Sequence, residues 1–242
     1  MVSRLVSISV IASFAAGLAV ATFAPFREFL PGLLGGALVT LQITIAGSVV
    51  AVVSAFIAAM TKMYAIAPLR WLAVTYIEIF RGTSLLVQLF WAFFVLPHFG
   101  LTLEPMAVAI LTIGLSYGAY GAELIRGAVL SVPRGQWEAT VALNMSRATA
   151  LRRIVLPQAL LAMIPPWGNL FIELLKGTAL VSLITITDLA FRAQQMNQTT
   201  FRTVEIFTLV LVFYFGIAQA ISAGMRMLEQ KAAGAIARGR AE

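Results

Sequence analysis

Two pairs of oppositely charged side chains lie within long apolar stretches of the sequence. Glu123 precedes Arg126 by three residues, and Glu173 precedes Lys176 by the same spacing. Residues three apart share one face of a helix, so each pair can form an ion pair. Ionisable groups inside a membrane often mark a substrate pathway. A zwitterionic solute needs an anionic and a cationic partner, and each pair offers both. A purely structural ion pair is the alternative at both places.

Further polar groups could line the same path. Asn169 lies one helical turn before Glu173, and Pro165-Pro166 must break their common helix, because proline removes a backbone donor and clashes with the preceding turn. Broken helices near the middle of a bilayer often mark a translocation path, although a kink can also serve packing alone. The candidate substrate path comprises Gln88, Tyr120, Glu123, Arg126, Asn169, Glu173 and Lys176.

The residue sets of common enzymes and metal sites are missing. The chain has no cysteine and one histidine, so disulfides and thiolate metal sites are excluded and no other metal site is expected. No G-x-x-x-x-G-K-[ST] phosphate loop and no H-E-x-x-H motif occurs. We therefore expect a chain that is not an enzyme and binds no cofactor of its own.

The composition is that of a membrane protein. Hydrophobic residues make up 60% of the chain and charged residues 11%, with a mean hydropathy of +0.93, whereas average soluble domains carry about 25% charged residues. The formal charge of +7 does not indicate nucleic-acid binding, because Lys and Arg in such chains mark cytoplasmic loops and contacts with membrane lipid. At about 20 residues per span, the sequence predicts an all-α polytopic bundle of five or six transmembrane helices.

Apolar runs place the spans and divide the chain. The spans are expected at residues 5–23, 33–60, 85–96, 106–130, 154–175 and 206–225. A cleaved signal peptide is the alternative for the first, and residues 62–81 are expected to form a loop or surface segment. The N-terminal transmembrane segment, the main transmembrane domain and a basic tail are expected at residues 1–29, 30–230 and 231–242. Two glycine pairs have the spacing that lets helices approach closely: Gly32 with Gly36, and Gly114 with Gly118.

The basic residues predict the orientation. If the N-terminus is inside and the six spans alternate, most of the 17 Lys and Arg residues fall on the inner side, including Lys62, Arg70 and Arg81. The positive-inside rule therefore places both termini in the cytoplasm, provided that the first segment is retained. The same rule places residues 133–157 in the cytoplasm.

Residues 133–157 form the longest polar interruption between two apolar spans. Pro133 and Gly135 predict a turn, and the sequence from Gln136 to about Met145 predicts a short helix with small and apolar residues on neighbouring faces. A second short helical piece, residues 148–153, leads back into the membrane. Such a helix either docks into a groove of a partner protein or lies on the lipid surface.

The spacing within this stretch resembles the coupling-loop pattern E-A-A-x3-G-x9-I-x-L-P of ABC importer permeases. The matching residues are Glu138-Ala139-Thr140, Asn144 and Ile154-Val155-Leu156-Pro157. Thr140 replaces an alanine and Asn144 the glycine of the bend, where Asn tolerates a left-handed backbone better than most residues. The residues that this resemblance assigns to ATPase coupling are Gln136, Glu138, Ala139, Thr140, Ala142, Asn144, Ile154, Leu156 and Pro157.

A wider resemblance covers nearly all of the chain after about Pro31. Four segments look like the polar amino-acid permease family, which imports histidine, arginine, glutamate, glutamine, opines and related compatible solutes: 36–41 (GALVTL), 80–88 (FRGTSLLVQ), 120–127 (YGAELIRG) and 176–180 (KGTAL). Segments 142–146 (ALNMS), 168–176 (GNLFIELLK) and 191–195 (FRAQQ) are most similar to its ectoine/hydroxyectoine branch.

The resemblance implies a type I ABC importer fold and a division of labour. A separate cytoplasmic ATPase dimer would bind ATP and Mg²⁺, and a periplasmic or lipid-anchored binding protein would deliver the solute. A second permease subunit would complete the path, more often as a heterodimer than as a homodimer. The location would be the cell inner membrane. A secondary transporter or channel that works alone, with Glu123 or Glu173 as a proton relay, is the alternative function.

Overall fold

The computed structural model describes residues 24–238, and this part of the chain is helical. Its elements are α2 (Ala24–Arg27), α3 (Leu30–Tyr64), α4 (Ala67–Gly82), α5 (Leu85–Phe90), η1 (Trp91–Val95), η2 (Leu96–Phe99), α6 (Pro105–Leu130), α7 (Arg134–Ala142), α8 (Arg147–Ala150), η3 (Leu151–Val155), α9 (Leu156–Gly177), η4 (Thr178–Ile184), α10 (Leu189–Thr200) and α11 (Thr203–Arg238). The all-α prediction is confirmed. The span expected at residues 5–23 lies outside the described residues.

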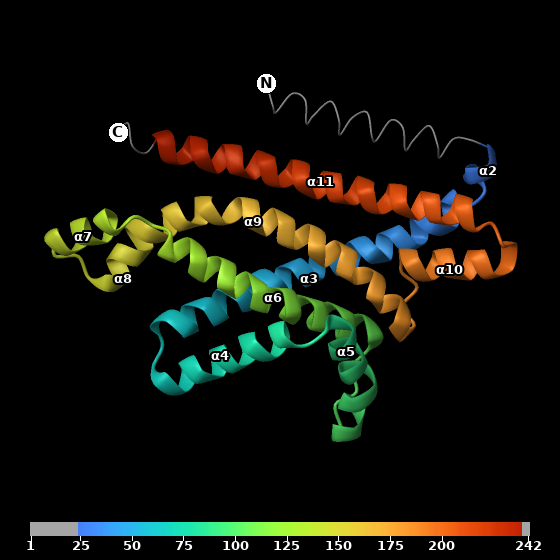
Figure 1. Ribbon diagram of the computed structural model, residues 1–242, viewed down its shortest axis with the longest axis horizontal. Coiled ribbons are helices and arrows are strands. Elements are labelled where there is room, and N and C mark those ends of the chain that lie inside the picture. The colour runs from blue at the N-terminus through green and yellow to red at the C-terminus, as the bar shows by residue number, and fades with distance from the viewer. Residues whose placement is uncertain (1–23, 239–242) are drawn as a thin grey trace.

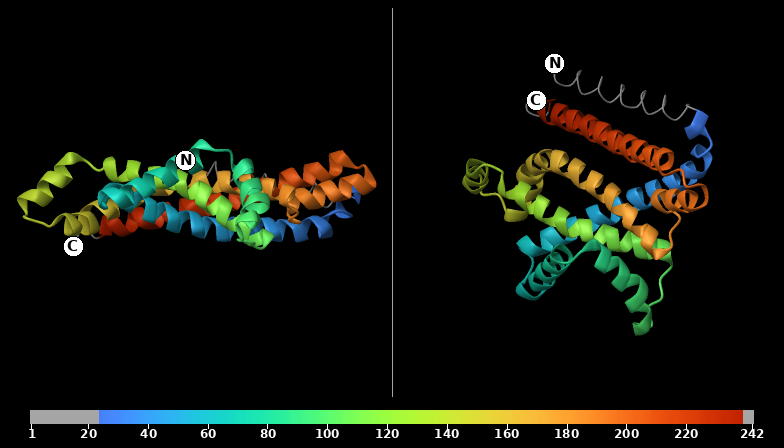
Figure 2. Two further views of the ribbon diagram at one scale, coloured as in Figure 1. Left: turned by 90° about the horizontal axis from the view of Figure 1, so that it is seen from below. Right: turned by 45° about the vertical axis from the view of Figure 1, so that its right-hand side comes forward.

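Four helical segments of the described part are long and apolar enough to cross a membrane: Leu30–Tyr64, Pro105–Leu130, Arg147–Ile184 and Thr203–Gly234. A fifth candidate is α4 together with Leu85–Phe99, two pieces that meet at 108°. Figures 1 and 2 show an elongated bundle, with the α7–α8 hairpin at one end and α10 at the other. These features confirm a polytopic helical membrane protein.

Helices α3 and α6 pack closely against each other. A Cβ atom on Gly114 would lie 2.5 Å from the Cβ atom of Val50, and one on Gly118 would collide with the Ser54 hydroxyl. The close approach predicted from the glycine spacing is therefore confirmed for this pair. Farther along, the Trp167 ring of α9 takes up the space above Gly121, 2.7 Å from where a Cβ would stand. The glycines of α6 therefore allow both α3 and α9 to approach this helix closely.

The segment before α10 crosses α3 equally closely. A Cβ atom on Gly36 would lie 2.8 Å from the carbonyl oxygen of Asp188. The Leu189 amide donates a hydrogen bond to Thr40 Oγ1 at 3.1 Å, and Asp188 Oδ1 caps α10 by accepting from the Phe191 amide at 2.9 Å. The Asp188 side chain is fully buried, and its Oδ2 atom has no partner among the described residues.

The prediction of a loop at residues 62–81 is wrong, because Ala67–Gly82 forms helix α4. The prediction gave too much weight to the cations, which lie at the ends of this helix: Arg70 in its first turn and Arg81 in its last. Pro68, a residue well suited to a helix start, was the overlooked signal. Lys62, in the last turn of α3, and Arg81, in the last turn of α4, are consequently separated by the length of α4.

The segment predicted as a span at residues 85–96 is helical, but it is a candidate membrane span only together with α4. The α-helical part ends at Phe90, and a π-helical and a 3-10 stretch follow up to Phe99. Thr83 has an extended backbone, with φ −118° and ψ 154°, and separates α4 from α5. The two pieces meet at this point with a bend of 108°, a geometry found both in broken spans and in re-entrant loops.

Helix α9 is not broken at Pro165-Pro166, contrary to the sequence prediction. It runs from Leu156 to Gly177 with both prolines inside. Met163 and Trp167 are buried on either side of the prolines, and this packing holds the helix together although two backbone donors are missing. Figure 1 shows the result as a curved helix. At the other end of the chain, α11 continues without interruption past residue 230, the expected start of the tail.

Candidate functional site

The α7–α8 hairpin projects from one end of the bundle (Figure 1). Pro133 precedes α7, and its carbonyl oxygen accepts from the Gln136 amide at 2.9 Å. The Ser146 hydroxyl caps α8 by accepting from the Thr149 amide at 3.3 Å. The predicted pair of short helices is confirmed, with α7 ending at Ala142 and not at about Met145.

The bend between the two helices is built on Asn144, whose φ angle is +51°. The left-handed backbone expected at this position is therefore confirmed. The Asn144 amide donates to the Val141 carbonyl, and the Met145 amide to the Thr140 carbonyl, both at 2.9 Å. Thr140 itself is buried, and its hydroxyl donates to the Trp137 carbonyl at 2.7 Å. Thr140 thus lies on the inner side of the hairpin.

The outer face of the hairpin carries bare apolar side chains. Val141 is 77% exposed and Leu143 73% exposed, and Glu138, Ala139 and Ala142 are exposed beside them. Apolar side chains of this size, gathered at the tip of a projecting hairpin, indicate a surface that another molecule covers. The coupling-loop resemblance assigns the neighbouring small residues Ala139 and Ala142 to ATPase coupling, but not Leu143.

The return segment is tied to α7 by a glutamine that the sequence reasoning missed. Gln158 Nε2 lies 3.2 Å from Gln136 Oε1 and 3.0 Å from the Ile154 carbonyl oxygen. Ile154 and Leu156 are half-buried, whereas Pro157 is exposed. Gln158 therefore links α7 to the start of α9. No local signal points to Gln158, since its partner is 22 residues away.

Glu123 holds two cations at the same end of the bundle as the hairpin. Arg126 Nε lies 2.9 Å from Glu123 Oε2, which confirms the predicted contact. Lys62 Nζ lies 2.6 Å from Glu123 Oε1 and joins α3 to α6. Because both carboxylate oxygens are engaged, this arrangement favours the structural reading of the pair. The Lys62 contact spans 61 residues and could not be read from local spacing.

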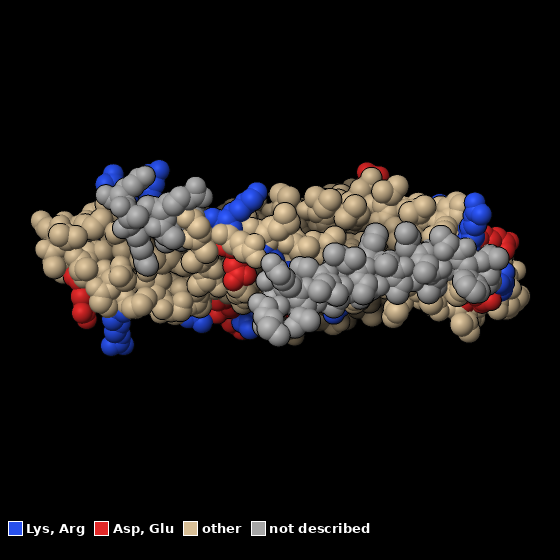
Figure 3. All heavy atoms as spheres, turned by 90° about the horizontal axis from the view of Figure 1, so that it is seen from above, with Lys and Arg blue, Asp and Glu red and all other residues tan. Residues whose placement is uncertain are grey.

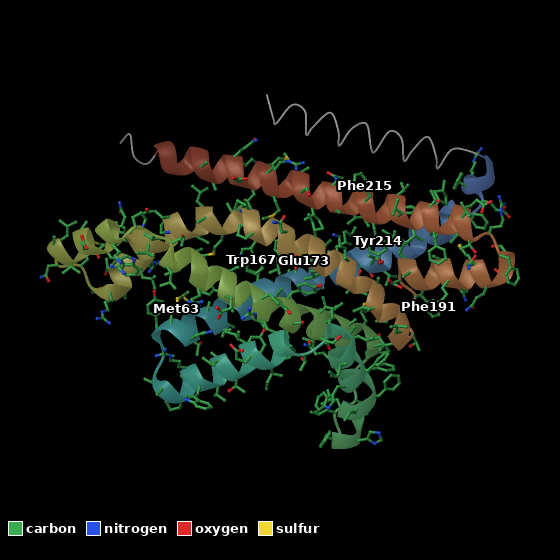
Figure 4. The ribbon with its side chains drawn as sticks, in the orientation of Figure 1. Met63, Trp167, Glu173, Phe191, Tyr214 and Phe215 are labelled. Carbon is green, nitrogen blue, oxygen red and sulfur yellow. The ribbon has the colours of Figure 1, made fainter. Side chains whose placement is uncertain are left out.

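Glu173 and Lys176 do not pair, contrary to the sequence prediction. Neither makes an ion pair within residues 24–238, and both side chains are exposed. The Glu173 carbonyl accepts from the Tyr117 hydroxyl at 2.8 Å, and Figure 4 shows where Glu173 and Trp167 lie along α9. Asn169 is also exposed, so α9 presents a polar stripe with no cover from the rest of the described chain.

A second group of polar side chains lies at the break between α4 and α5. The Arg81 guanidinium lies 5.6 Å from the centre of the Tyr120 ring, halfway along α6. Gln88 Nε2 donates to the Phe80 carbonyl at 2.9 Å and lies 2.8 Å from Thr83 Oγ1. Gln88 therefore stabilises the break, and Tyr120 carries a cation on its face. Arg81 was missed because it had been assigned to a loop.

The candidate residues thus fall into separate groups. Glu123 with Arg126 lies near the hairpin end, Gln88 with Tyr120 lies at the α4–α5 break, and the α9 stripe stands apart. In the part of the chain that the structure covers, no group of three His, Asp or Glu residues could hold a metal ion.

Residues 47–234 match the family model described as "Binding-protein-dependent transport system inner membrane component". The chain belongs to this family. It is therefore a non-catalytic, multi-pass component of the inner membrane, one part of a transport system that also depends on a binding protein.

Individual relatives agree with this assignment. The chain is 44% identical to the probable amino-acid ABC transporter permease protein y4tF of Sinorhizobium fredii, over 84% of this chain and 88% of that protein. It is 38% identical to the L-cystine transport system permease protein TcyB of Bacillus subtilis, over 79% and 82%. It is 36% identical to the glutamine transport system permease protein GlnP of Escherichia coli, over 84% and 93%.

A solved structure shares the fold closely. The crystal structure of an amino acid ABC transporter with histidines superposes with a TM-score of 0.80 at 32% identity, and covers 86% of this chain and 98% of that one. An inward-facing form of the MetNI methionine ABC transporter superposes with a TM-score of 0.69 at 18% identity, which supports the fold alone. The predicted ABC importer fold is confirmed.

Proposed function

We propose that this chain is the permease subunit of an ATP-driven importer of polar amino acids or related zwitterionic solutes, with the ATPase docked on the α7–α8 hairpin. The observation that carries the proposal is the exposed apolar tip at Val141 and Leu143, beside the left-handed turn at Asn144. A helix that inserts its apolar face into a groove buries side chains of this kind. The chain runs from the hairpin directly into α9, and Gln158 links the two, so ATPase movements at the hairpin would reach this span.

The proposed translocation path uses the two exposed polar surfaces that lie along the bundle, away from the hairpin. Arg81 on Tyr120 offers a cation for a substrate carboxylate, and the α9 stripe of Asn169 and Glu173 offers acceptors for an amino group. Lys176 lies at the end of this stripe. Polar side chains on a spanning helix need a water-filled path or a protein neighbour. A second permease subunit, more often a different chain than a copy, would enclose this path.

The substrate class rests on resemblance. The glutamine and cystine permeases among the relatives support amino acids, and the segments 142–146, 168–176 and 191–195 support the narrower proposal of ectoine or hydroxyectoine. Calorimetric titration of the partner binding protein with ectoine, hydroxyectoine, glutamine and cystine tests this choice. Tight binding of ectoine alone supports the narrower proposal, whereas binding of glutamine or cystine alone contradicts it.

The orientation belongs to the same proposal. The hairpin, and with it the C-terminal part of the chain after residue 230, would lie in the cytoplasm with both termini. Arg126, Arg134, Arg147, Arg152 and Arg153 support this orientation, because they lie in or beside the hairpin.

Substitution in the hairpin tests the docking. In the assembled transporter, Ala139→Trp and Glu138→Lys should each lower substrate-stimulated ATP hydrolysis at least about tenfold, the change that follows a loss of about 1.4 kcal/mol at an interface. Ala233→Trp, at an exposed alanine of α11, is the matched control and should leave hydrolysis unchanged. Wild-type hydrolysis and uptake in both hairpin variants, with normal membrane levels, would refute the proposal.

A further inference from the structure

A basic cavity of about 600 Å³ lies at the hairpin end of the bundle. The charged residues that line it are Lys62, Arg70, Arg126 and Arg134, and the aromatic ones include Tyr64 and Trp137. They come from the end of α3, the start of α4, the end of α6 and the start of α7. Figure 4 labels Met63, another residue of its lining, at the corner between α3 and α4.

The cavity has more positive charge than its own acid groups neutralise. Lys62 and Arg126 share the single carboxylate of Glu123. Arg70 and Arg134 make no ion pair with any residue in the described part of the chain. Glu138 follows Arg134 by four residues but is exposed and is likewise unpaired there. Two guanidinium groups therefore remain free to bind an anion.

The cavity also lies where a membrane ends. Lys62 and Tyr64 close the span Leu30–Tyr64, and Leu130 closes the span Pro105–Leu130. Tyr and Trp side chains are typical of the interface between membrane and water. Seen from the α11 side, Figure 3 shows Lys and Arg side chains, with a few Asp and Glu side chains, over the half of the molecule that ends in the hairpin, and a second, mixed group of charges at the opposite end.

Apolar surface adjoins the cations on the side of the bundle. Ile66 is 70% exposed, Trp71 76% and Leu130 66%. Arg70 also lines a neighbouring hollow of about 390 Å³, together with Ala67, Trp71 and Val74. A ligand with a negative headgroup and an apolar tail would fit both features, whereas a free anion or an acidic protein segment would leave the apolar surface uncovered.

We propose that this cavity binds the phosphate headgroup of an anionic phospholipid, with Arg70 and Arg134 as its main contacts. The acyl chains lie against the exposed apolar surface around Trp71 and Leu130. Because Arg134 and Trp137 belong to α7 whereas Arg70 belongs to α4, the lipid joins the hairpin to the spans. Anionic lipid thereby holds the hairpin in position for its partner.

Native mass spectrometry of the assembled transporter tests the site. Complexes are prepared in nanodiscs that contain phosphatidylglycerol and phosphatidylethanolamine, and the retained lipids are identified. The Arg70→Gln/Arg134→Gln variant should bind phosphatidylglycerol on the order of 30-fold more weakly, since each Arg near an anionic surface contributes about 1 kcal/mol. Retention equal to that of the wild type overturns the proposal.

The control carries the same change in charge at the other end of the molecule. Arg27 and Arg192 are cations outside the cavity, in α2 and α10, and Arg27→Gln/Arg192→Gln should retain phosphatidylglycerol as the wild type does. Equal loss in both double variants would show a general effect of charge and would also overturn the proposal.

Two further measurements distinguish other ligands. Inorganic phosphate should not raise the melting temperature of the transporter, whereas phosphatidylglycerol should raise that of the wild type but not that of the Arg70→Gln/Arg134→Gln variant. Equal stabilisation by phosphate would assign the cavity to a free anion. Loss of the ATPase from the variant complex with unchanged lipid retention would assign it to a protein partner.

Discussion

Asp188 is the buried carboxylate that joins α10 to α3. Its side chain has no exposed surface, and one oxygen caps α10 while the other has no partner in the described structure. Tyr214 of α11, whose buried hydroxyl is also without a partner there, is the titratable group that faces it. Burial raises the pKa of Asp188 from 3.8 to about 6, against the smaller effect of the backbone hydrogen bonds that it accepts.

This raised pKa predicts a pH dependence of stability. Between about pH 4 and pH 6 the folded protein holds a proton that the unfolded chain has lost, so stability falls as the pH rises through this window and stays low above it. Asp188→Asn keeps a capping side chain and should remove the fall. The variant should be more stable at neutral pH, by on the order of 3 kcal/mol.

Thermal melting of the transporter in nanodiscs at pH 4.5 and pH 7.5 measures the difference. Gln198→Asn, at an exposed position of α10, is a control that removes no titratable group and should leave the slope of stability against pH unchanged. A slope that persists in Asp188→Asn would assign the pH dependence to other groups.

At the scale of elements, the contact between α3 and α6 depends on glycines. Gly114 and Gly127 lie on the same helix, but a Cβ on Gly114 would stand 2.5 Å from Val50 whereas one on Gly127 would meet nothing within 4 Å. Gly114→Val should therefore destabilise the protein by about 1–3 kcal/mol through overpacking. Gly127→Val adds the same atoms to the same helix and should have little effect.

Melting temperatures of the two glycine variants provide the measurement, with uptake as a second readout. If Gly127→Val destabilises as much as Gly114→Val, the cost lies in the properties of valine within a helix and the close approach of α3 is not responsible.

The elements also show where sequence reasoning succeeds and where it fails. Spans and glycine contacts follow from local spacing, and so does the left-handed turn at Asn144, because each depends on residues a few positions apart. The bonds from Lys62 to Glu123 and from Gln158 to Gln136 join distant residues and had no local signal. The α4–α5 break and the uninterrupted α9 were missed because charges were taken to mark a loop and prolines to mark a helix end. In both places the packing of the folded chain outweighs these local signals.

At the scale of the whole molecule, the exposed polar stripe on α9 requires a partner. Asn169, Glu173 and Lys176 are uncovered in the single chain, and a polar face of this kind is unfavourable against lipid. We therefore predict that a second permease chain covers it. When this chain is expressed together with the second permease subunit, two differently tagged copies of this chain should not be captured together.

Affinity capture with one tag and detection of the other measures the subunit composition. Efficient joint capture of both tags would establish a homodimer and contradict the expected heterodimer. Because the stripe is expected to face the second permease chain, Glu173→Leu should weaken assembly, whereas Leu160→Ala, at another exposed position of α9, should leave it unchanged.

The two prolines inside α9 extend this surface beyond its side chains. Because Pro165 and Pro166 have no backbone N–H, the carbonyl oxygens of Leu161 and Ala162 lose the donors that normally lie four residues farther on. Ala162 and Pro165 are exposed, on the line that continues to Asn169 and Glu173. Helix α9 thus carries two main-chain acceptors without their usual helical donors, on the N-terminal side of the exposed side chains of Asn169 and Glu173.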